Sequence, residues 1–170
     1  KPPPKGMAEC IPDYRDIHEV AVPPYTEEEH GTWKLLIENQ KEVLPKRACN
    51  EFMEGLAEIK FPENRIPRLA DISDAIEKYT GWKIMRVDGL VPDKEFFQLL
   101  SEKIFPSTDF IRDRSELGYT PSPDMFHDLL GHVPLLINPR FTAFFEKFGQ
   151  AGVKAFELGH PGTKMLPRIY

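Results

Sequence analysis

One short segment, His127-Asp-Leu-Leu-Gly-His-Val-Pro-Leu-Leu136, constrains the fold more than any other part of the chain. Its leucines and valine are apolar enough to require burial, yet two histidines lie among them, five positions apart. An imidazole is costly to bury unless its ring nitrogens have partners. The fold must therefore enclose this segment and also provide polar or metal partners for both histidines.

Two side chains five positions apart on a continuous helix point about 140° away from each other, so both rings cannot reach one metal unless the helix ends between them. Gly131 is the residue where such an end is expected, in the left-handed conformation, and Pro134 prevents the helix from resuming. His132 could then turn back toward His127. The spacing alone leaves two interpretations about equally favoured: a metal site, or a core network for one histidine and a turn for the other.

A metal site needs a further ligand, and the nearest carboxylates are those of Asp124 and Asp128. Asp124 is better placed to cap the start of a short helix expected over residues 125–130. Asp128 points about 100° away from its neighbour His127 on that helix, which suits contact with a ligand or water. The spacing of the residues therefore does not identify the third ligand.

The remaining pattern predicts a mainly α-helical fold with a few short β-strands. Thr26 and Glu29 form a capping box before a helix that Pro45 should interrupt. Further helices are expected over residues 48–59, 71–79, 92–100 and 138–156, and strands over 82–87 and 105–112. Residues 1–25 are rich in proline and are expected to be an extended segment lying on the body or partly disordered.

Composition limits the class of protein. A chain of 170 residues that is 41% hydrophobic can bury one sizeable core, which predicts a single domain. Lys and Arg total 22 against 27 Asp and Glu, for a net charge of -5, and no dense basic run suggests nucleic acid or an anionic membrane as a partner. The longest uncharged apolar stretch, residues 133–138, is far shorter than the about 20 residues of a membrane span. We therefore expect a soluble, cytoplasmic protein.

The run Tyr119-Thr-Pro-Ser-Pro-Asp-Met-Phe-His-Asp-Leu-Leu-Gly-His-Val-Pro-Leu135 resembles the signature of the pterin-dependent aromatic amino acid hydroxylases. The similarity extends to Val87-Asp-Gly-Leu-Val91, Phe110-Ile-Arg112 and Leu166-Pro-Arg-Ile-Tyr170. The resemblance implies a single catalytic domain over residues 26–170 with its C-terminal part missing. It also implies a monooxygenase that hydroxylates a free aromatic amino acid with iron(II), a tetrahydropterin and dioxygen. The oligomeric state is left open.

The same resemblance implies roles for individual residues. His127 and His132 would bind iron(II), completed by a glutamate expected shortly beyond Tyr170, and Asp128 would act beside them. The residues implied around the pterin are Gly89, Leu90, Val91, Phe96, Asp128 and Tyr170. Those implied around the substrate are Arg112, Thr120, Pro123 and Asp124, with the arginine gripping the substrate carboxylate in two parallel hydrogen bonds.

Three departures from the animal enzymes, Asp128, Ser122 and Phe105-Pro106, resemble bacterial members of the family and favour L-phenylalanine as the substrate. Hydroxylation of tyrosine or tryptophan is an alternative within the family. From another class, a zinc hydrolase would use the same histidine pair with Asp128 as its base. Against it, the spacing is not HExxH, and the Gly-Leu-Val segment and Arg112 would have no purpose. A metal-free binding module is the third interpretation.

Overall fold

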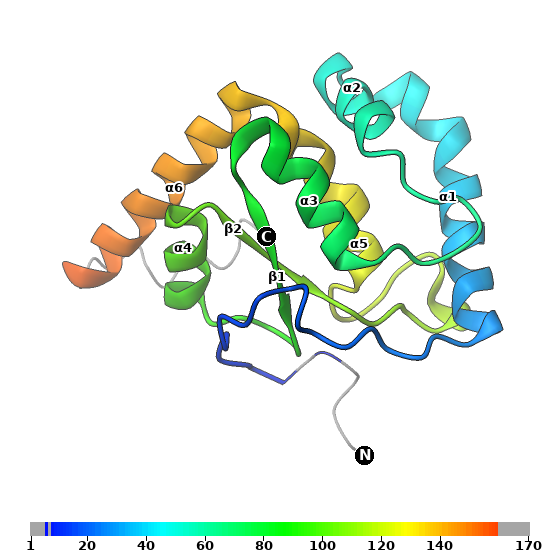
Figure 1. Ribbon diagram of the computed structural model, residues 1–170, viewed down its shortest axis with the longest axis horizontal. Helices are drawn as coiled ribbons and strands as arrows, with labels where there is room; N and C mark the ends of the chain where they lie inside the picture. The colour runs from blue at the N-terminus through cyan, green and yellow to red at the C-terminus, as the bar shows by residue number, and fades with distance from the viewer. Residues whose placement is uncertain (1–5, 7, 160–170) are drawn as a thin grey trace.

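The computed structural model describes Gly6 and residues 8–159, and its helices surround a small two-stranded sheet (Figure 1). The α-helices, in chain order, are α1 (Glu27–Arg47), α2 (Asn50–Ile59), α3 (Leu69–Thr80), α4 (Asp93–Ser101), α5 (Met125–His132) and α6 (Pro139–Glu157). The strands are β1 (Lys83–Val87) and β2 (Ile104–Thr108), and short 3-10 helices form η1 (Arg114–Glu116) and η2 (Val133–Ile137). This architecture confirms the mainly helical fold with a few short strands.

The two strands pair in parallel, with Lys83 opposite Ile104 and Val87 opposite Thr108. A parallel pair needs a crossover connection, and α4 lies in that connection. Helix α3 contacts β1, α5 contacts β2, and α4 packs along α6. Both strands end at the same edge of the sheet, so the segments that follow Val87 and Thr108 begin side by side.

The apolar part of the histidine-containing segment lies in the hydrophobic core, as its composition predicts. Leu129, Val133 and Leu136 are fully buried and belong to the same cluster as Trp33 and Trp82. Helix η2 contacts α2, α3 and α6, so the chain is enclosed directly after α5. This packing fixes the orientation of α5 and therefore the direction in which it presents its histidines.

Helix α1 begins as expected and ends later than expected. The Thr26 hydroxyl accepts a hydrogen bond from the Glu29 N–H, and the Glu29 carboxylate accepts one from the Thr26 N–H, which confirms the capping box. The expected interruption at Pro45 is wrong, because the helix continues to Arg47. A proline in the last turn removes one donor near a helix end that is already closing, so its effect is local.

Strand β2 ends at Thr108, before the expected residue 112, because the next residue is engaged elsewhere. The backbone carbonyl of Asp109 accepts a hydrogen bond from the Tyr25 hydroxyl at 2.6 Å. Its carboxylate accepts one from the Arg86 guanidinium at 2.8 Å. Asp109 is thereby held by Tyr25 of the N-terminal segment and, through its side chain, by Arg86 of β1, and the backbone pairing of the strands ends at Thr108.

The N-terminal segment, as far as residues 8–25 describe it, is largely without helix or strand and crosses the edge of the sheet (Figure 1). Contacts that attach it to the body include the single parallel bridge between Glu9 and Leu90, the pair of His18 with Asp74, and the hydrogen bond from Tyr25 to Asp109. The boundary between this segment and a catalytic domain over residues 26–170 stays a prediction.

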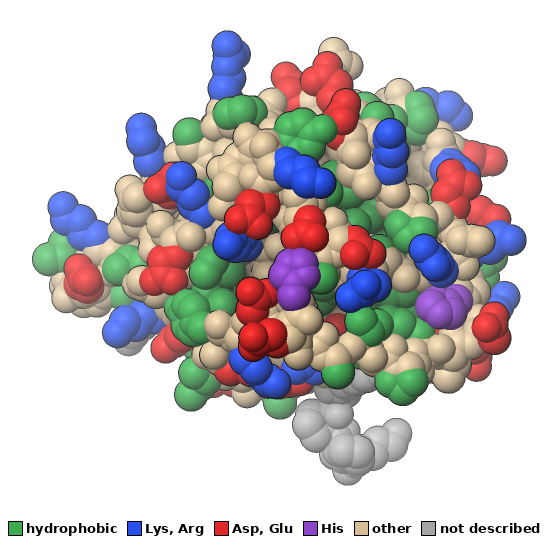
Figure 2. Space-filling model, in the orientation of Figure 1, with side chains coloured by type: hydrophobic (Ala, Val, Ile, Leu, Met, Phe, Trp, Pro, Cys, Tyr) green, Lys and Arg blue, Asp and Glu red, His purple; other side chains and the backbone are tan. Residues whose placement is uncertain are grey.

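The surface drawn in Figure 2 carries acidic and basic side chains interspersed, without a continuous basic patch on that face. In the described part of the chain, none of the helices combines the length and the apolar character needed to cross a membrane.

We expect Leu136→Ala to lower the free energy of unfolding by about 2 to 5 kcal/mol, because the substitution leaves a cavity in a close-packed core. Leu136 is 0% exposed, whereas Leu158 is 73% exposed and supplies a matched control. Leu158→Ala should change stability by no more than about 0.5 kcal/mol. Urea unfolding of both variants measures the difference, and equal losses would contradict the burial of η2.

Candidate active site

The structure brings the two histidines of α5 together. The Nε2 atoms of His127 and His132 lie 3.3 Å apart, and their ring centroids are 5.1 Å apart. The His132 ring also packs against the Phe105 ring, with 5.3 Å between centroids. His127 is exposed on the surface of the described chain and His132 is partly buried, so the pair lies at the margin of the core. Two ring nitrogens therefore face one common point.

The reason expected for this convergence is wrong. Gly131 does not adopt the left-handed conformation, and α5 continues through it to His132. The change of direction occurs at His132 itself, whose φ of -123° and ψ of -41° leave ideal helical geometry before η2 begins. Pro134 lies near the start of η2, where a missing N–H donor is tolerated. A tighter right-handed turn thus replaces the expected left-handed end.

The charge state of the pair suits a metal. Partial burial lowers the pKa of His127, and burial together with the neighbouring His127 lowers the pKa of His132 to about 4. Both imidazoles are therefore neutral near pH 7, the form in which a ring nitrogen can bind a metal. Two nitrogen ligands held about 2.1 Å from one ion at a right angle are about 3.0 Å apart, close to the spacing seen here.

A third protein ligand is not found among the described residues. Within Gly6 and residues 8–159, no group of three His, Cys, Asp or Glu side chains is arranged to hold a metal. Asp124 and Asp128 have other partners. Tyr170 and the glutamate expected beyond it lie outside the described residues.

Asp124 joins the loop after β2 to the start of α5. Its buried carboxylate accepts hydrogen bonds from the Nε and Nη2 atoms of Arg112, both at 2.8 Å, and from the Arg112 N–H at 2.9 Å. It also accepts one from the His127 N–H at 3.0 Å, which confirms Asp124 as the N-cap of α5. The same carboxylate therefore orients a guanidinium and holds the backbone of a site histidine.

Asp128 is buried and faces the end of β2. Its carboxylate accepts hydrogen bonds from the Thr108 N–H at 2.9 Å and from the Thr108 hydroxyl at 3.1 Å. Burial raises the pKa of the Asp128 carboxyl to about 7, although both hydrogen bonds from Thr108 oppose the shift. A carboxyl group with this pKa can act as either a hydrogen-bond donor or an acceptor near neutral pH.

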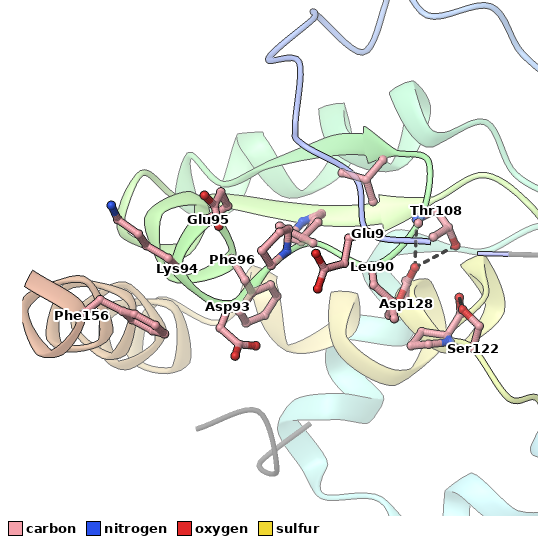
Figure 3. Close-up of a pocket in the computed structure, with 16 residues that line it drawn as sticks. Glu9, Leu90, Asp93, Lys94, Glu95, Phe96, Thr108, Ser122, Asp128 and Phe156 are labelled. Atoms are coloured by element: carbon pink, nitrogen blue, oxygen red, sulfur yellow. Dashed lines mark hydrogen bonds between the residues drawn. The ribbon is translucent and has the colours of Figure 1, made fainter. Parts of the chain in front are cut away.

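A cavity of about 710 Å³ opens at the edge where both strands end (Figure 3). Its volume suits a bicyclic organic ligand. Among its lining residues are Gly89, Leu90, Val91, Phe96 and Asp128. The structure thus brings together every residue that the sequence implied around the pterin, apart from Tyr170, which is not described.

The residues implied around the substrate do not share one cavity. Arg112 and Thr120 line a second cavity of about 350 Å³, whereas Pro123 lines the larger one. Asp124 lines neither cavity and is fully buried. The described chain therefore presents Arg112 and Pro123 to two neighbouring spaces.

Glu9 and Thr108 are among the lining residues of the larger cavity to which the sequence analysis gave no role. Glu9 reaches it from the N-terminal segment, and Thr108 reaches it from the end of β2. The lone Glu9 in a proline-rich stretch carries no recognisable signal. Thr108 lies in the middle of the strand expected over residues 105–112, and only the structure shows that β2 ends there, at the strand edge where ligands often bind in parallel sheets.

Residues 4–159 match the family model described as biopterin-dependent aromatic amino acid hydroxylase. The arrangement of helices around a short parallel strand pair is that of the catalytic domains of such hydroxylases. The chain belongs to the biopterin-dependent aromatic amino acid hydroxylase family.

Individual relatives are close. The chain is 46% identical over 146 residues to a phenylalanine-4-hydroxylase of Chromobacterium violaceum. The aligned region covers 86% of this chain and 48% of that protein. A crystal structure of the enzyme from the same organism bound to cobalt aligns with a TM-score of 0.82 at 44% identity, over 89% of this chain and 55% of that one. Another crystal structure from this organism, with iron and phenylalanine bound, aligns with a TM-score of 0.77 at 42% identity. The alignment covers 88% of this chain and 54% of that one. The chain spans about half the length of the curated relatives it matches.

We expect Arg112→Ala to cost about 3 to 5 kcal/mol of unfolding free energy, because it leaves the Asp124 carboxylate buried without its partner. The side chains of this pair are 10% and 0% exposed. Arg68 forms an ion pair with Asp71 whose side chains are 59% and 65% exposed, so Arg68→Ala is a matched control that should cost less than about 1 kcal/mol. Chemical denaturation of the two variants tests this, and a small loss for Arg112→Ala would refute the role given to the buried pair.

Proposed function

We propose that this chain is part of a phenylalanine hydroxylase, a monooxygenase that converts free L-phenylalanine to tyrosine with iron(II), a tetrahydropterin and dioxygen. The observation that carries the proposal is the convergence of His127 and His132 beside a cavity lined by Asp128. The similarity to phenylalanine-4-hydroxylases supports the choice of phenylalanine over tyrosine and tryptophan. A zinc hydrolase is not favoured, since the whole matched region belongs to a hydroxylase family.

In this proposal, His127 and His132, whose Nε2 atoms lie 3.3 Å apart, would hold iron(II) together with a carboxylate outside the described residues. A set of two histidines and one carboxylate would leave other positions of the ion open for further ligands. When bound, iron(II) and the reduced pterin supply the electrons that activate dioxygen, one oxygen atom going to the aromatic ring and the other to the pterin. The protein contributes position and surroundings.

Asp124 and Arg112 would place the amino acid substrate. Two of the guanidinium nitrogens and the backbone N–H of Arg112 already point at Asp124, so the side chain is held in one orientation. A guanidinium fixed in this way can direct its remaining donors at the substrate carboxylate without losing further side-chain freedom. Thr120, on the same cavity as Arg112, and Pro123 would complete the walls around the substrate.

The larger cavity would hold the pterin. The Phe96 ring offers an aromatic face on which a flat heterocycle can stack, and the backbone of residues 89–91 offers donors and acceptors at its edge. Asp128, whose pKa is about 7, can share a proton with the polar edge of the cofactor. The hydrogen bonds from Thr108 fix the direction of that carboxyl group.

Product analysis tests the proposed reaction. The full-length protein is loaded anaerobically with iron(II) and then given tetrahydropterin, dioxygen and equal amounts of phenylalanine, tyrosine and tryptophan. Mass spectrometry should show tyrosine formed from phenylalanine as the main product. If iron is bound and no amino acid gains oxygen, the hydroxylase assignment is wrong. If hydroxylated tyrosine or hydroxylated tryptophan is the main product, the protein is a hydroxylase of that amino acid and not of phenylalanine.

Metal content tests the histidine pair separately. We expect His127→Ala to lower iron affinity and turnover by more than about 100-fold, since changes beside a metal already cost about 10- to 100-fold. His18 is an exposed histidine paired with Asp74 on the surface, so His18→Ala is the matched control and should retain iron. Iron bound per protein, measured after dialysis, distinguishes them. Equal iron in all three proteins would exclude His127 as a ligand.

A further inference from the structure

Glu9 is one of three carboxylates, with Asp93 and Glu95, that line the larger cavity and have no part in the function proposed above. Glu9 comes from the N-terminal segment, yet it lines the same cavity as Gly89, Leu90 and Phe96. Its own backbone is attached to the cavity wall. The Leu90 N–H donates to the Ala8 carbonyl at 3.0 Å, and the Cys10 N–H donates to the Leu90 carbonyl at 2.9 Å.

These two hydrogen bonds determine the direction of the Glu9 side chain. They form a parallel bridge in which Glu9 is paired with Leu90. Successive side chains of an extended segment point to opposite faces. Cys10 packs on one side against the cluster of Met85, Val87 and Leu99, so Glu9 points to the other side, into the cavity.

The turn at Gly89 leaves room for the backbone of residues 8–10. A Cβ atom at Gly89 would lie 2.3 Å from the carbonyl oxygen of Ala8, which is closer than any real contact. A side chain at that position would push residues 8–10 away from Leu90. Gly89 therefore does more than allow a ligand to approach, because it lets the N-terminal segment form a wall of the cavity.

Figure 3 shows the Glu9 carboxylate near the centre of the cavity, beside Leu90 and Phe96, whereas Lys94 extends away from it. Asp93 is near enough that Glu9 contributes, after burial, to raising the pKa of the Asp93 carboxyl. The polar groups around the ligand space are thus mainly acidic. A ligand with two neighbouring N–H donors would complement this carboxylate in a bidentate manner.

A reduced pterin carries such a pair of donors, in its 2-amino group and the adjacent N3–H. We propose that Glu9 is a specificity-determining residue for the cofactor, whose carboxylate accepts hydrogen bonds from this aminopyrimidinone edge. The inference rests on the proposed function. It adds a side-chain acceptor next to the backbone groups of residues 89–91, which line the same cavity, and it gives the N-terminal segment a part in cofactor recognition.

The test compares two cofactors that differ only at this edge. A tetrahydropterin has the 2-amino group, and the corresponding tetrahydrolumazine has an oxygen there, which a carboxylate repels. Binding of each is measured anaerobically by calorimetry on the full-length protein, on Glu9→Gln and on Glu19→Gln. Glu19 is an exposed glutamate of the same N-terminal segment and lines none of the cavities described above, so it controls for the loss of charge.

Glu9→Gln should weaken tetrahydropterin binding about 10-fold, because a charge-assisted hydrogen bond to a partly exposed carboxylate is lost. Tetrahydrolumazine binding should be unchanged or stronger, and Glu19→Gln should match the original protein with both ligands. Equal affinity of the original protein and Glu9→Gln for tetrahydropterin overturns the inference and leaves the proposed function intact. An equal loss for both ligands also overturns it, because Glu9 would then act on cavity shape alone. No binding of tetrahydropterin by the original protein overturns the proposed function as well.

Discussion

The buried carboxylate of Asp124 is the interaction on which the site depends. It accepts hydrogen bonds from Arg112, through backbone and guanidinium, and from the N–H of His127. A single anion without solvent contact therefore caps the first turn of α5, holds a cation beside it and ties the loop after β2 to the helix. The positive end of the helix dipole at that turn stabilises the charge further. Because all these partners share one side chain, the position of His127 and the orientation of Arg112 cannot vary independently.

The elements set by local sequence were predicted well. The capping box of Thr26 and Glu29 starts α1, and Asn138 caps α6, since the donors and acceptors concerned are a few residues apart. The convergence of His127 and His132 was also foreseen, but its cause was not. Glycine permits the left-handed conformation without requiring it, and at Gly131 the surrounding core favours a right-handed continuation into η2. Core packing decides between these two backbone conformations, and the order of residues in the sequence does not reveal that packing.

The parts that sequence reasoning missed are those made by contacts between distant segments. The end of β2 depends on Tyr25, and the orientation of Asp128 depends on Thr108. Glu9 enters the cavity only because two backbone hydrogen bonds attach its segment to Leu90. The family resemblance supplied the residues around Gly89 and Phe96, and these do line one cavity. It did not reveal that the N-terminal segment forms another wall of the same space.

The attachment of residues 8–10 to Leu90 couples the binding of a ligand in the cavity to the ordering of the N-terminal segment. If a ligand in the cavity contacts this segment, the ligand favours the attached state over the detached one, and attachment must raise the affinity for the ligand by the same factor. The larger core cluster, around Trp33 and Leu129, contains none of residues 8–10. Resistance of the N-terminal segment to a protease would then report occupancy of the cavity, without any measurement of turnover.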